Sequence, residues 1–414
     1  MLHGASLAEV NQLGAQGALT VINDYADSLP NFKKLYMEEN EWVMKSWTDD
    51  EENLYGWPIY GVSRDVNHGF MYRKDIFDAN DIPAWNTTEE FYNAMKQLKE
   101  IYPDSVPYAS KTQENIFRDW GYGWGVTGAD YPMYYDEGAG TWKFMFTQPE
   151  FKDMIDFMKK MYDEGLLDPE FITDTDASWT AKMTSENRAF VTFDWIGRLD
   201  MFHTQVKDQM PEYDLRYANP IGPVGKIHQL NKVQMWGHMV PKNANNEAAL
   251  KLLDYLSSPS GSALVTLGIE DEHYVFGADG KVEYPNLDVD KVEISVLENE
   301  YGGWLEGMYM YVHPQSAYFN YTEKEQEAQD MMVNNDRIDV LDPILKFTNE
   351  ETEAKAELTQ SLLQGGIEFA TKYVIDKNYG DAQWEAWVSE AENLKVGELE
   401  DIFNNAQARY NSGN

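Results

Sequence analysis

Residues 236–276 read WGHMVPKNANNEAALKLLDYLSSPSGSALVTLGIEDEHYVF, a stretch in which signals for secondary structure follow one another closely. The apolar run Met239–Val240 stops at Pro241, which predicts the end of a strand. Asn245 and Asn246 offer capping oxygens to a helix that follows. The apolar residues of this helix lie at helical spacing on one face: Ala249, Leu252, Leu253 and Leu256.

A second helix and a hairpin come directly after it. Ser258 offers a capping oxygen and Pro259 presets the first turn, so the pair predicts a new helix. Gly268 predicts a left-handed backbone where that helix ends. Residues 274–284 then read as a hairpin that turns at Asp279–Gly280. The stretch therefore predicts the order strand, helix, helix and hairpin.

Several phrases of this sequence carry a resemblance to a known family. They are EAALKLLDYL at 247–256, SPSGSALVTLGIEDEHY at 258–274, GADGK at 277–281 and the C-terminal segment 379–410. Together they resemble the family 1 extracellular solute-binding proteins of ABC importers, particularly the lipoprotein branch for saccharides. The resemblance implies an α/β fold of two lobes, periplasmic-binding-protein-like and of type II, with an interlobe cleft and crossover hinge strands.

The same resemblance implies how the chain divides between the lobes. We expect residues 1–107 and 236–300 to form lobe 1, and residues 108–235 and 301–414 to form lobe 2 with the C-terminal helices. The first crossover between the lobes is then expected at Val106–Tyr108. Residues 13–35 resemble a region well inside lobe 1 of this family. This implies that the first βαβ portion, a signal peptide and a lipid-bearing cysteine precede the chain.

The charge balance restricts the partners that we expect. The chain has 33 Lys and Arg residues against 71 Asp and Glu residues, for a net charge of −38. Such a field repels nucleic acid and anionic membrane surfaces, and it favours a neutral ligand over a polyanionic one. Most of these carboxylates are interpreted as a solvated acidic surface. Cysteine is absent, which excludes disulfides, thiolate metal sites and a thiol nucleophile.

Membrane and metal signals are weak. No window reaches the ~18 apolar residues that a membrane span needs. Membrane attachment is therefore expected only through the lipid anchor that the resemblance implies, on a monomer at the extracellular cell surface. Residues 174–176 begin like a calcium loop but lack its glycine and distal glutamate, and the loop 101–107 lacks the alternating Asp and Asn of calcium-binding relatives. We expect no cofactor and no metal.

The segment VTFDWIGR at 191–198 supplies the first candidate site residues. In the family this region places an aromatic side chain in the cleft, so the resemblance makes Trp195 the first choice for a platform on which a sugar ring stacks. Asp194 and Arg198 flank it and are expected to hydrogen-bond sugar hydroxyls. Packing in the core is the competing interpretation of Trp195.

Residues 54–78 match a family region that crosses the ligand cleft. The resemblance therefore implies four further candidates: Tyr60, Arg64, Asn67 and His68. Arg64 would serve equally well in a surface ion pair with Asp65 or another neighbour. His68 would serve equally well as a turn residue beside Gly69.

Aromatic residues in apparent loops supply the remaining candidates. Residues 117–128, FRDWGYGWGVTG, formally match G-x-G-x-x-G, but a dinucleotide site needs a strand before it and a helix after it, and neither is evident. We interpret this segment as an aromatic loop facing the cleft, although such aromatics also fill cores. A return crossover at 236–238 and a second aromatic loop at 301–317 add to it. The candidates from these segments are Trp120, Trp124, Trp236, His238 and Trp304.

Two functions from different classes remain. The resemblance implies the substrate-binding component of an ABC importer, which captures an oligosaccharide and delivers it to a membrane permease without any catalytic residue. The alternative is a glycoside hydrolase on a two-domain scaffold, which needs two carboxylates flanking the scissile bond. With 71 acidic residues such a pair is available by chance. No H-E-x-x-H, G-x-S-x-G or P-loop motif occurs. A structural surface protein is a third interpretation.

Overall fold

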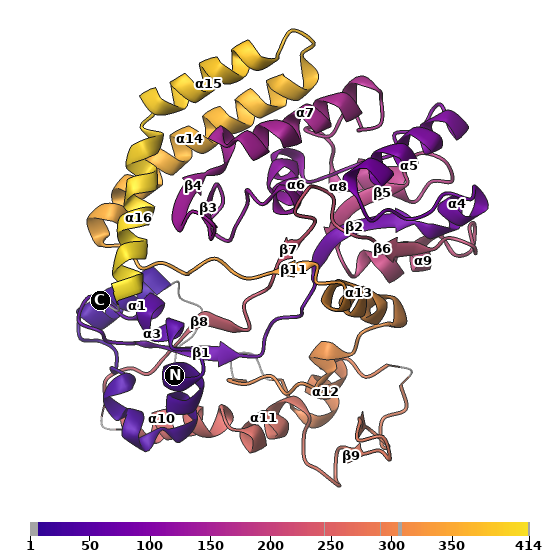
Figure 1. Ribbon diagram of the computed structural model, residues 1–414. Coiled ribbons are helices and arrows are strands. Elements are labelled where there is room, and N and C mark those ends of the chain that lie inside the picture. Colours follow the sequence, from indigo (N-terminus) through magenta and orange to yellow (C-terminus); the bar gives the residue numbers. More distant parts are fainter. Residues whose placement is uncertain (1–6, 244, 290, 305–308, 413–414) are drawn as a thin grey trace.

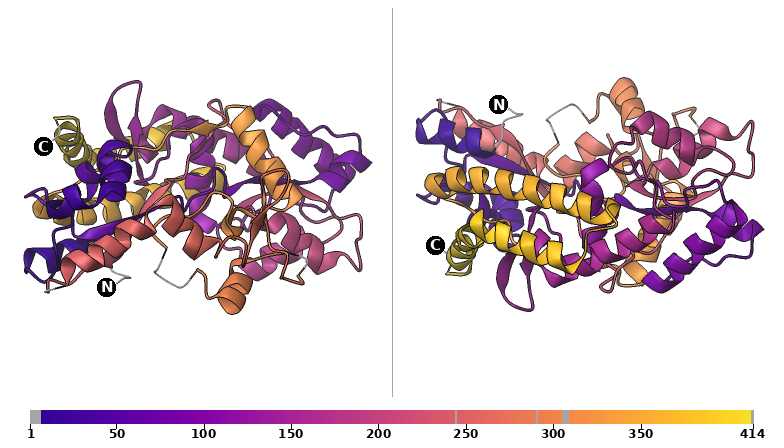
Figure 2. Two further views of the ribbon diagram at one scale, coloured as in Figure 1. Left: turned by 90° about the horizontal axis from the view of Figure 1, so that it is seen from below. Right: turned by 90° about the horizontal axis from the view of Figure 1, so that it is seen from above.

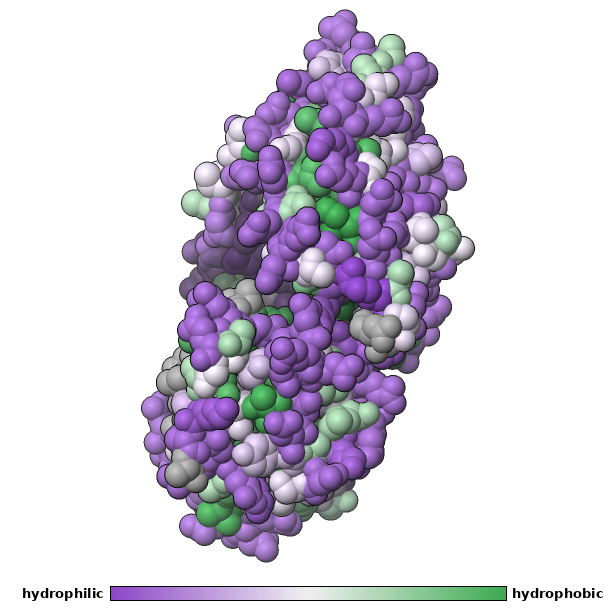
Figure 3. Space-filling view, turned by 90° about the vertical axis from the view of Figure 1, so that its left-hand side faces the viewer, coloured by the Kyte–Doolittle hydropathy of each residue, from purple (hydrophilic) through white to green (hydrophobic). Residues whose placement is uncertain are grey.

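The chain folds into two lobes that are joined by several crossing segments (Figure 1). The computed structural model describes residues 7–243, 245–289, 291–304 and 309–412. The C-terminal helices pack on lobe 2, and α14 and α15 lie side by side there (Figures 1 and 2). A hollow separates the lobes on the side drawn in Figure 3, and the surface around it is mostly hydrophilic.

Each lobe combines short strands with helices. The elements of lobe 1 are α1 (Leu7–Ala15), α2 (Pro30–Phe32), α3 (Trp42–Trp47), β1 (Gly56–Tyr60), β8 (Val233–Met239), α10 (Asn246–Leu256), α11 (Pro259–Thr266), β9 (Val275–Phe276), β10 (Val282–Glu283) and α12 (Ile294–Tyr301). The elements of lobe 2 are β2 (His68–Arg73), α4 (Lys74–Ala79), α5 (Thr88–Ile101), α6 (Ile116–Trp124), β3 (Met133–Asp136), β4 (Thr141–Phe144), α7 (Pro149–Asp163), α8 (Asp176–Met183), β5 (Val191–Trp195), α9 (Arg198–Val206), β6 (Leu215–Tyr217), β7 (Ile227–His228), α13 (Glu323–Asn334), β11 (Ile338–Asp339), α14 (Asn349–Ile375), α15 (Asp381–Asn393) and α16 (Val396–Ser412).

The sheet of lobe 2 is built around β2, which pairs antiparallel with β5 on one side and β6 on the other. Phe70 of β2 lies opposite Phe193 of β5, with ring centroids 5.3 Å apart. Both belong to the largest buried core, which also takes in α5, α6, α7 and the C-terminal helices. Aromatic rings of this size remove large apolar areas from water, so this core stabilises lobe 2.

Lobe 1 has a smaller core behind the antiparallel pair β1 and β8. Trp57 of β1 is fully buried, and its ring centroid lies 5.1 Å from that of Phe32. Its indole Nε1 donates to the Ser257 hydroxyl at 3.1 Å, which satisfies the one polar atom of the ring. The carboxylate of Asp254 accepts from the Phe32 backbone N–H at 2.8 Å and so ties α10 to α2.

The stretch 236–276 folds in the predicted order. β8 ends at Met239, just before Pro241. The Ser258 hydroxyl accepts from the Gly261 N–H at 3.0 Å and caps α11, which ends before Gly268 with its φ of +114°. The predicted hairpin is the pair β9 and β10, which turns through Gly280 with a φ of +78°.

Two details of that stretch differ from the prediction. The buried leucines of α10 are Leu250, Leu253 and Leu256, whereas Leu252 is exposed. Spacing alone allowed a neighbouring face, and the position of α2 decides which face is covered. Asn245 makes no capping bond. Instead, the side-chain oxygen of Asn246 accepts from the Asn243 N–H at 2.6 Å.

The buried cores group the chain differently from the predicted boundaries. Phe70, Phe77 and Phe91 pack in one core with residues of α6 and α7, so residues 68–107 lie in lobe 2 rather than lobe 1. Tyr108 bridges to Leu167 and Val191 within lobe 2, so Val106–Tyr108 is not a crossover. Trp304 packs with residues of lobe 1 such as Ile59. The resemblance indicated two lobes, but only packing decides which strands share a core.

The crossing segments meet beside β1. Residues 61–67 lead from β1 to β2, and residues 229–232 lead from β7 to β8. The Gly61 N–H donates to the Lys232 carbonyl at 2.7 Å, and the Ser63 hydroxyl bonds the Asn231 carbonyl. The Tyr318 hydroxyl from a third connecting segment, 313–322, bonds the Val62 carbonyl. Hydrogen bonds between connections far apart in sequence therefore hold the lobes together beside β1, and the segment between β11 and α14 adds a second contact, where the Ser46 hydroxyl donates to the Ile344 carbonyl.

Residues 116–124 form the helix α6, whereas the sequence predicts an aromatic loop there. The loop was predicted because the segment contains glycines, and glycine is a poor helix former. The structure requires them for close approach instead. A Cβ added at Gly123 would lie 1.6 Å from the Ile221 carbonyl oxygen, and one added at Gly121 would lie 2.3 Å from the Thr127 hydroxyl. Gly125 then caps the helix with a φ of +71°.

We predict that Gly123→Ala lowers the free energy of unfolding by about 1–3 kcal/mol, because the added methyl group collides with backbone that cannot yield. Gly397→Ala in α16 is the matched control, since an added Cβ there meets nothing within 4 Å. The control should raise stability by up to about 1 kcal/mol through helix propensity. Urea unfolding measures both, and equal effects of the two substitutions would contradict this account of α6.

Candidate functional site

A cavity of about 340 Å³ opens where β2, β5, α6 and β7 come together. We call it the first cavity. Its size is at the lower end of the range for small-molecule sites, which is about 300–1,000 Å³. Its lining residues are Asp65, Asn67, His68, Thr112, Arg118, Asp119, Tyr122, Phe193, Asp194, Ile227, His228 and Leu230. Asn67, His68 and Asp194 of this set were predicted from the sequence.

Trp195 ends β5, directly after Asp194 and opposite His68 in the strand register, and it is not itself a lining residue of the first cavity. It is 39% exposed, so the competing interpretation as a core residue does not hold. Its ring covers Gly197, where an added Cβ would lie 2.3 Å from the ring edge. A large flat apolar surface that remains open to water beside a polar cavity can accept the C–H face of a sugar ring.

Asp194 is a buried carboxylate held by two cations. Its Oδ2 accepts from Arg198 Nε at 2.9 Å and lies 3.2 Å from Lys111 Nζ. Both cations also reach Asp176 Oδ1, at 3.2 Å from Arg198 Nη2 and 2.7 Å from Lys111 Nζ. The hydrogen bond from Lys111 lowers the pKa of Asp176. Burial of a charge is costly unless it is paired, and this network meets that condition.

The cations of this network are themselves positioned by Trp179. Lys111 Nζ lies 4.7 Å and the Arg198 guanidinium 5.2 Å from the centre of its fully buried ring. Cation–π attraction and two carboxylates therefore hold each cation. Arg198 was predicted to bond a sugar directly, but its guanidinium pairs with Asp194 and Asp176, so it orients the carboxylate that lines the cavity.

Asn67 and His68 stand at the start of β2, where the chain enters lobe 2. The Asn67 side chain lies 3.3 Å from His68 Nδ1, and the Asn67 carbonyl accepts from the Ile196 N–H at 2.8 Å. The Tyr217 hydroxyl donates to the His68 carbonyl at 2.7 Å, passing over Gly69. A Cβ at Gly69 would lie 1.7 Å from that hydroxyl, so glycine is needed for this bond to form.

Arg118 and Asp119 form the α6 wall of the first cavity. Asp119 is buried, and its Oδ1 accepts from Arg118 Nη2 at 2.9 Å and Nε at 3.2 Å. Its other oxygen, Oδ2, is buried without a hydrogen-bond partner in the described structure. Burial raises the pKa of Asp119 to about 6, and the Arg118 guanidinium only partly opposes this shift. The carboxyl can therefore hold or release a proton near neutral pH.

Two predicted site residues, Tyr60 and Arg64, lie away from the first cavity, in lobe 1 and at the crossing. Tyr60 packs edge-on against Tyr311, with ring centroids 5.1 Å apart. Arg64 donates to the Tyr318 carbonyl at 3.0 Å, and its Nη1 lies 3.7 Å from Glu325 Oε1. Arg64 therefore links the crossing segment 61–67 to the segment 313–322 and to the start of α13. Its ion-pair partner is Glu325 rather than Asp65.

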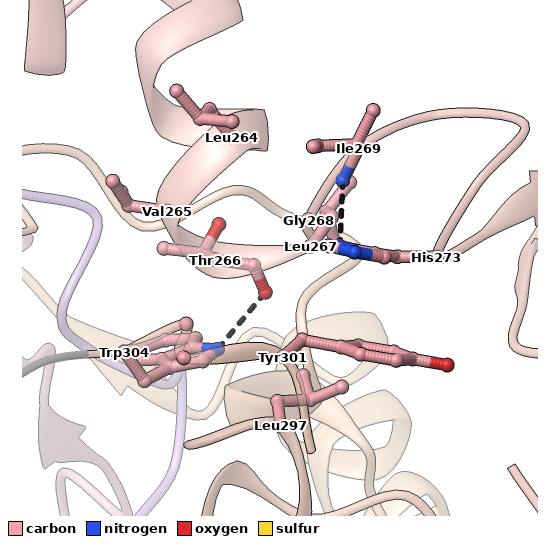
Figure 4. Close-up of a pocket in the computed structure, with 12 residues that line it drawn as sticks. Leu264, Val265, Thr266, Leu267, Gly268, Ile269, His273, Leu297, Tyr301 and Trp304 are labelled. Atoms are coloured by element: carbon pink, nitrogen blue, oxygen red, sulfur yellow. Dashed lines mark hydrogen bonds between the residues drawn. The ribbon is translucent and has the colours of Figure 1, made fainter. Parts of the chain in front are cut away.

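Trp304 is also away from the first cavity. Its indole donates to the Thr266 carbonyl at 2.9 Å, in a separate apolar cavity of about 250 Å³ in lobe 1 (Figure 4). On the opposite side of that cavity the rings of His273 and Tyr301 are stacked 4.2 Å apart. The predicted role of Trp304 as a cleft residue is wrong, because its ring is buried in lobe 1 with Ile59 and Leu297, a packing that was not readable from sequence.

The remaining predicted aromatics are mostly in cores. Trp120 is fully buried and donates to the Tyr108 hydroxyl at 2.9 Å, so its prediction as a cleft residue is wrong. Trp124 is stacked against Trp120 but also lines a second cavity beside the first. His238 is buried in β8 opposite Trp57. Trp236 lies in β8, and its side chain is outside the described residues.

Several site residues were missed from the sequence. They are Lys111, Arg118, Asp119, Tyr122, Asp176 and His228. Arg118, Asp119 and Tyr122 stand within the segment 117–128 that was singled out for its tryptophans. A helical reading of that segment would have placed Arg118 and Tyr122 one turn apart on the same face. For Lys111 and His228 no sequence signal was available, because they come from separate elements, and the calcium-like start at 174–176 did not indicate that Asp176 pairs with Lys111.

Comparison with known proteins identifies the family. Residues 5–267, more than half of the chain, match the family model described as bacterial extracellular solute-binding protein. This chain belongs to that family. The solute-binding protein is 23% identical to Lipoprotein LipO of Bacillus subtilis (strain 168) and 24% identical to the polygalacturonan/rhamnogalacturonan-binding protein YtcQ of the same organism. Each alignment covers 94% of this chain, with 78% of LipO and 77% of YtcQ.

A solved structure of a binding protein has the same fold. The solute-binding protein is similar to the alginate-binding protein AlgQ2 in its form without calcium ion, with a TM-score of 0.68 and 20% identity. The match covers 97% of this chain and 84% of that chain. The two-lobed α/β fold of a solute-binding protein is therefore confirmed.

The described residues contain neither a membrane-spanning helix nor a metal-binding cluster. None of their helices combines the length and apolar character that crossing a bilayer requires. Within the same residues, no group of three or more His, Asp or Glu side chains is arranged to hold a metal ion.

We predict a pH-dependent stability contribution from Asp119. Its folded pKa of about 6 lies above the ordinary value of 3.8, so the folded state binds the extra proton and stability falls as pH rises between these values. Relative to Asp119→Asn, the solute-binding protein should lose about 1 kcal/mol of unfolding free energy between about pH 5 and about pH 7.5. Denaturant unfolding of both proteins cancels the background of other carboxyls. Parallel pH curves would contradict a raised pKa.

Proposed function

We propose that this chain is the substrate-binding component of an ABC importer, capturing an oligosaccharide between its lobes and delivering it to a membrane permease. The observation that carries the proposal is an exposed Trp195 platform that directly follows Asp194, whose buried carboxylate lines the first cavity beside the crossing segments. A ring platform and fixed acceptors next to each other meet the two needs of sugar recognition.

The chemistry of Asp194 supports a ligand rich in hydroxyl groups. Both cations that hold this carboxylate contact its Oδ2, and the residue also lines the cavity. A carboxylate held in this way accepts hydrogen bonds from sugar hydroxyls without having to be ordered on binding. Asn67 beside it can both donate and accept. These groups give direction, while the Trp195 ring contributes apolar area.

The relatives support the same ligand class. YtcQ is named as a polygalacturonan/rhamnogalacturonan-binding protein, and AlgQ2 is named as an alginate-binding protein. The similarity of this chain to Lipoprotein LipO supports a lipid-anchored protein on the extracellular side of the membrane. We further propose that it acts as a monomer, because one chain supplies both lobes and the cavity.

The crossing segments support capture by closure of the lobes. They are few, and they meet in a small region around Gly61, with a φ of +78°, and Lys232. Closure about such a region would bury a bound sugar between the lobes, and the closed form is what a permease would recognise.

The alternative, a glycoside hydrolase, has one observation in its favour. Asp119, with its pKa raised to about 6, lines the same cavity as Asp194, and glycosidases use two carboxyls with different pKa values. Each of these carboxyls is tied to an arginine, however, which suits a fixed acceptor better than a group that must transfer protons. We therefore favour binding without catalysis.

The absence of catalysis is directly testable. Incubation of the protein with oligosaccharides that it binds should release no new reducing ends, measured against the buffer blank. Release that disappears in Asp119→Asn would replace the binding proposal with the hydrolase alternative.

We predict that Trp195→Ala lowers the affinity for the bound oligosaccharide at least about tenfold, equal to about 1.4 kcal/mol, while the melting temperature without ligand changes little. The reason is that the exposed ring contributes to ligand contact rather than to the core. Isothermal titration calorimetry with a panel of oligosaccharides measures the effect, and Trp195→Phe should recover part of it.

Tyr255→Ala is the matched control, because Tyr255 is an exposed aromatic residue on α10 of lobe 1, 44% exposed and away from the cavity. Its affinity should equal that of the unaltered protein. Unchanged affinity in Trp195→Ala would reject Trp195 as the platform, and no binding across the whole panel would reject the saccharide proposal itself.

A further inference from the structure

A second cavity of about 310 Å³ adjoins the first. Its lining residues are Trp124, Gly125, Thr127, Tyr134, Tyr135, Asp136, Glu137, Glu150, Val224, His228, Asp339, Val340 and Asp342. They come from the end of α6 and the residues after it, the β3–β4 hairpin, the start of α7, β7 and the loop before it, and β11 with the segment that follows it. His228 lines both cavities, so the two meet at this side chain.

His228, where the two cavities meet, lies in a paired strand and not in a loop. β7 pairs parallel with β11, which places Asp339 beside His228 in the register. The ring of His228 lies 5.5 Å from that of Tyr122, which lines the first cavity, while Trp124 at the end of the same helix lines the second. Burial lowers the pKa of His228, so its ring is neutral at physiological pH. A neutral ring with two nitrogens can both donate and accept.

The second cavity is lined by hydrogen-bond acceptors and aromatic rings. Asp342 is buried, and its Oδ2 accepts from the Ala129 N–H at 3.1 Å. Asp136 is paired with Lys143 at 2.6 Å. The other acidic residues of the lining are Glu137, Glu150 and Asp339. Tyr134 and Tyr135 supply apolar surface beside these oxygens. This combination of aromatic surface and fixed acceptors is the one already seen in the first cavity.

The described lining of the two cavities offers very little positive charge. Its one Lys or Arg residue is Arg118, and two of the guanidinium nitrogens already bond Asp119. A uronate carboxylate would therefore meet several acidic side chains and, among the described lining residues, a single cation, Arg118, which is already paired with Asp119. Like charges at close range in a partly dehydrated cavity cost far more than in water. Hydroxyl donors, in contrast, would find an acceptor at each end of the paired cavities.

We propose that the second cavity is a further subsite of the same cleft, so that the ligand is an uncharged oligosaccharide long enough to pass His228 and occupy both cavities. The inference rests on the proposed function and adds the length and charge class of the ligand. It separates this chain from the relatives named for polygalacturonan, rhamnogalacturonan and alginate.

The experiment is calorimetric titration with two sets of probes, each from disaccharide to hexasaccharide. The neutral set consists of malto-, cello-, xylo-, manno- and galacto-oligosaccharides, and the acidic set consists of oligogalacturonates and oligomers of alginate. We expect the tightest binding within the neutral set. We also expect affinity to rise at least about tenfold beyond the disaccharide, since units in the second cavity bind as part of a molecule that is already held.

Val340→Trp tests the second cavity by filling it. Val340 lines this cavity and is 54% exposed, so a larger side chain should be tolerated by the fold. The variant should lose most of the gain in affinity for the longer sugars and keep the disaccharide affinity. Val333→Trp is the matched control, since Val333 is 51% exposed on α13 and lines neither cavity. It should behave as the unaltered protein does.

The outcomes distinguish this inference from the proposed function. An oligouronate as the tightest ligand, an affinity that does not change with length, or equal behaviour of the two tryptophan variants would overturn the second subsite while leaving saccharide binding intact. Failure of every probe to bind would overturn both proposals together.

Discussion

The hydrogen bonds between the crossing segments are the constraint on which the rest of the structure depends. Gly61 and Lys232 join two connections that are far apart in sequence, and Tyr318 ties a third to the same place. The first of these connections ends at His68 and the second begins after His228. Because the connections are held together, the starts and ends of strands from distant parts of the chain are brought to one cavity.

The buried ion network gives that cavity its chemical character. Lys111 and Arg198 form ion pairs with Asp194 and Asp176, and Arg118 forms one with Asp119. Pairing makes it possible for carboxylates to be buried, since an isolated buried charge would shift its pKa and neutralise. In this site the cations are paired with the site's own carboxylates. The carboxylate oxygens can still accept hydrogen bonds from a ligand. The net charge of −38 also favours an uncharged ligand, but the local ion pairs determine what the cavity can bind.

The sequence was least informative where tertiary contacts overrode local preference. Residues 116–124 contain two glycines and still form a helix, because Gly123 allows the Ile221 carbonyl to approach and because the tryptophans of the helix are buried. Local propensity is a weak signal beside such packing. Trp120 and Trp304 are buried, whereas Trp195 is exposed, with its ring lying over Gly197. An aromatic residue in an apparent loop does not by itself reveal which side it faces.

The sequence by itself determined the family, the two-lobed class of fold and the order of elements in residues 236–276, because capping residues, prolines and glycines act within a few positions of one another. It also pointed to Asp194, Trp195, Asn67 and His68. Only the tertiary structure decided where the lobes divide, which cations hold Asp194 and that His228 joins two cavities. The physical reason is that these features depend on contacts between segments separated by many residues, and no local pattern records which distant side chains will meet.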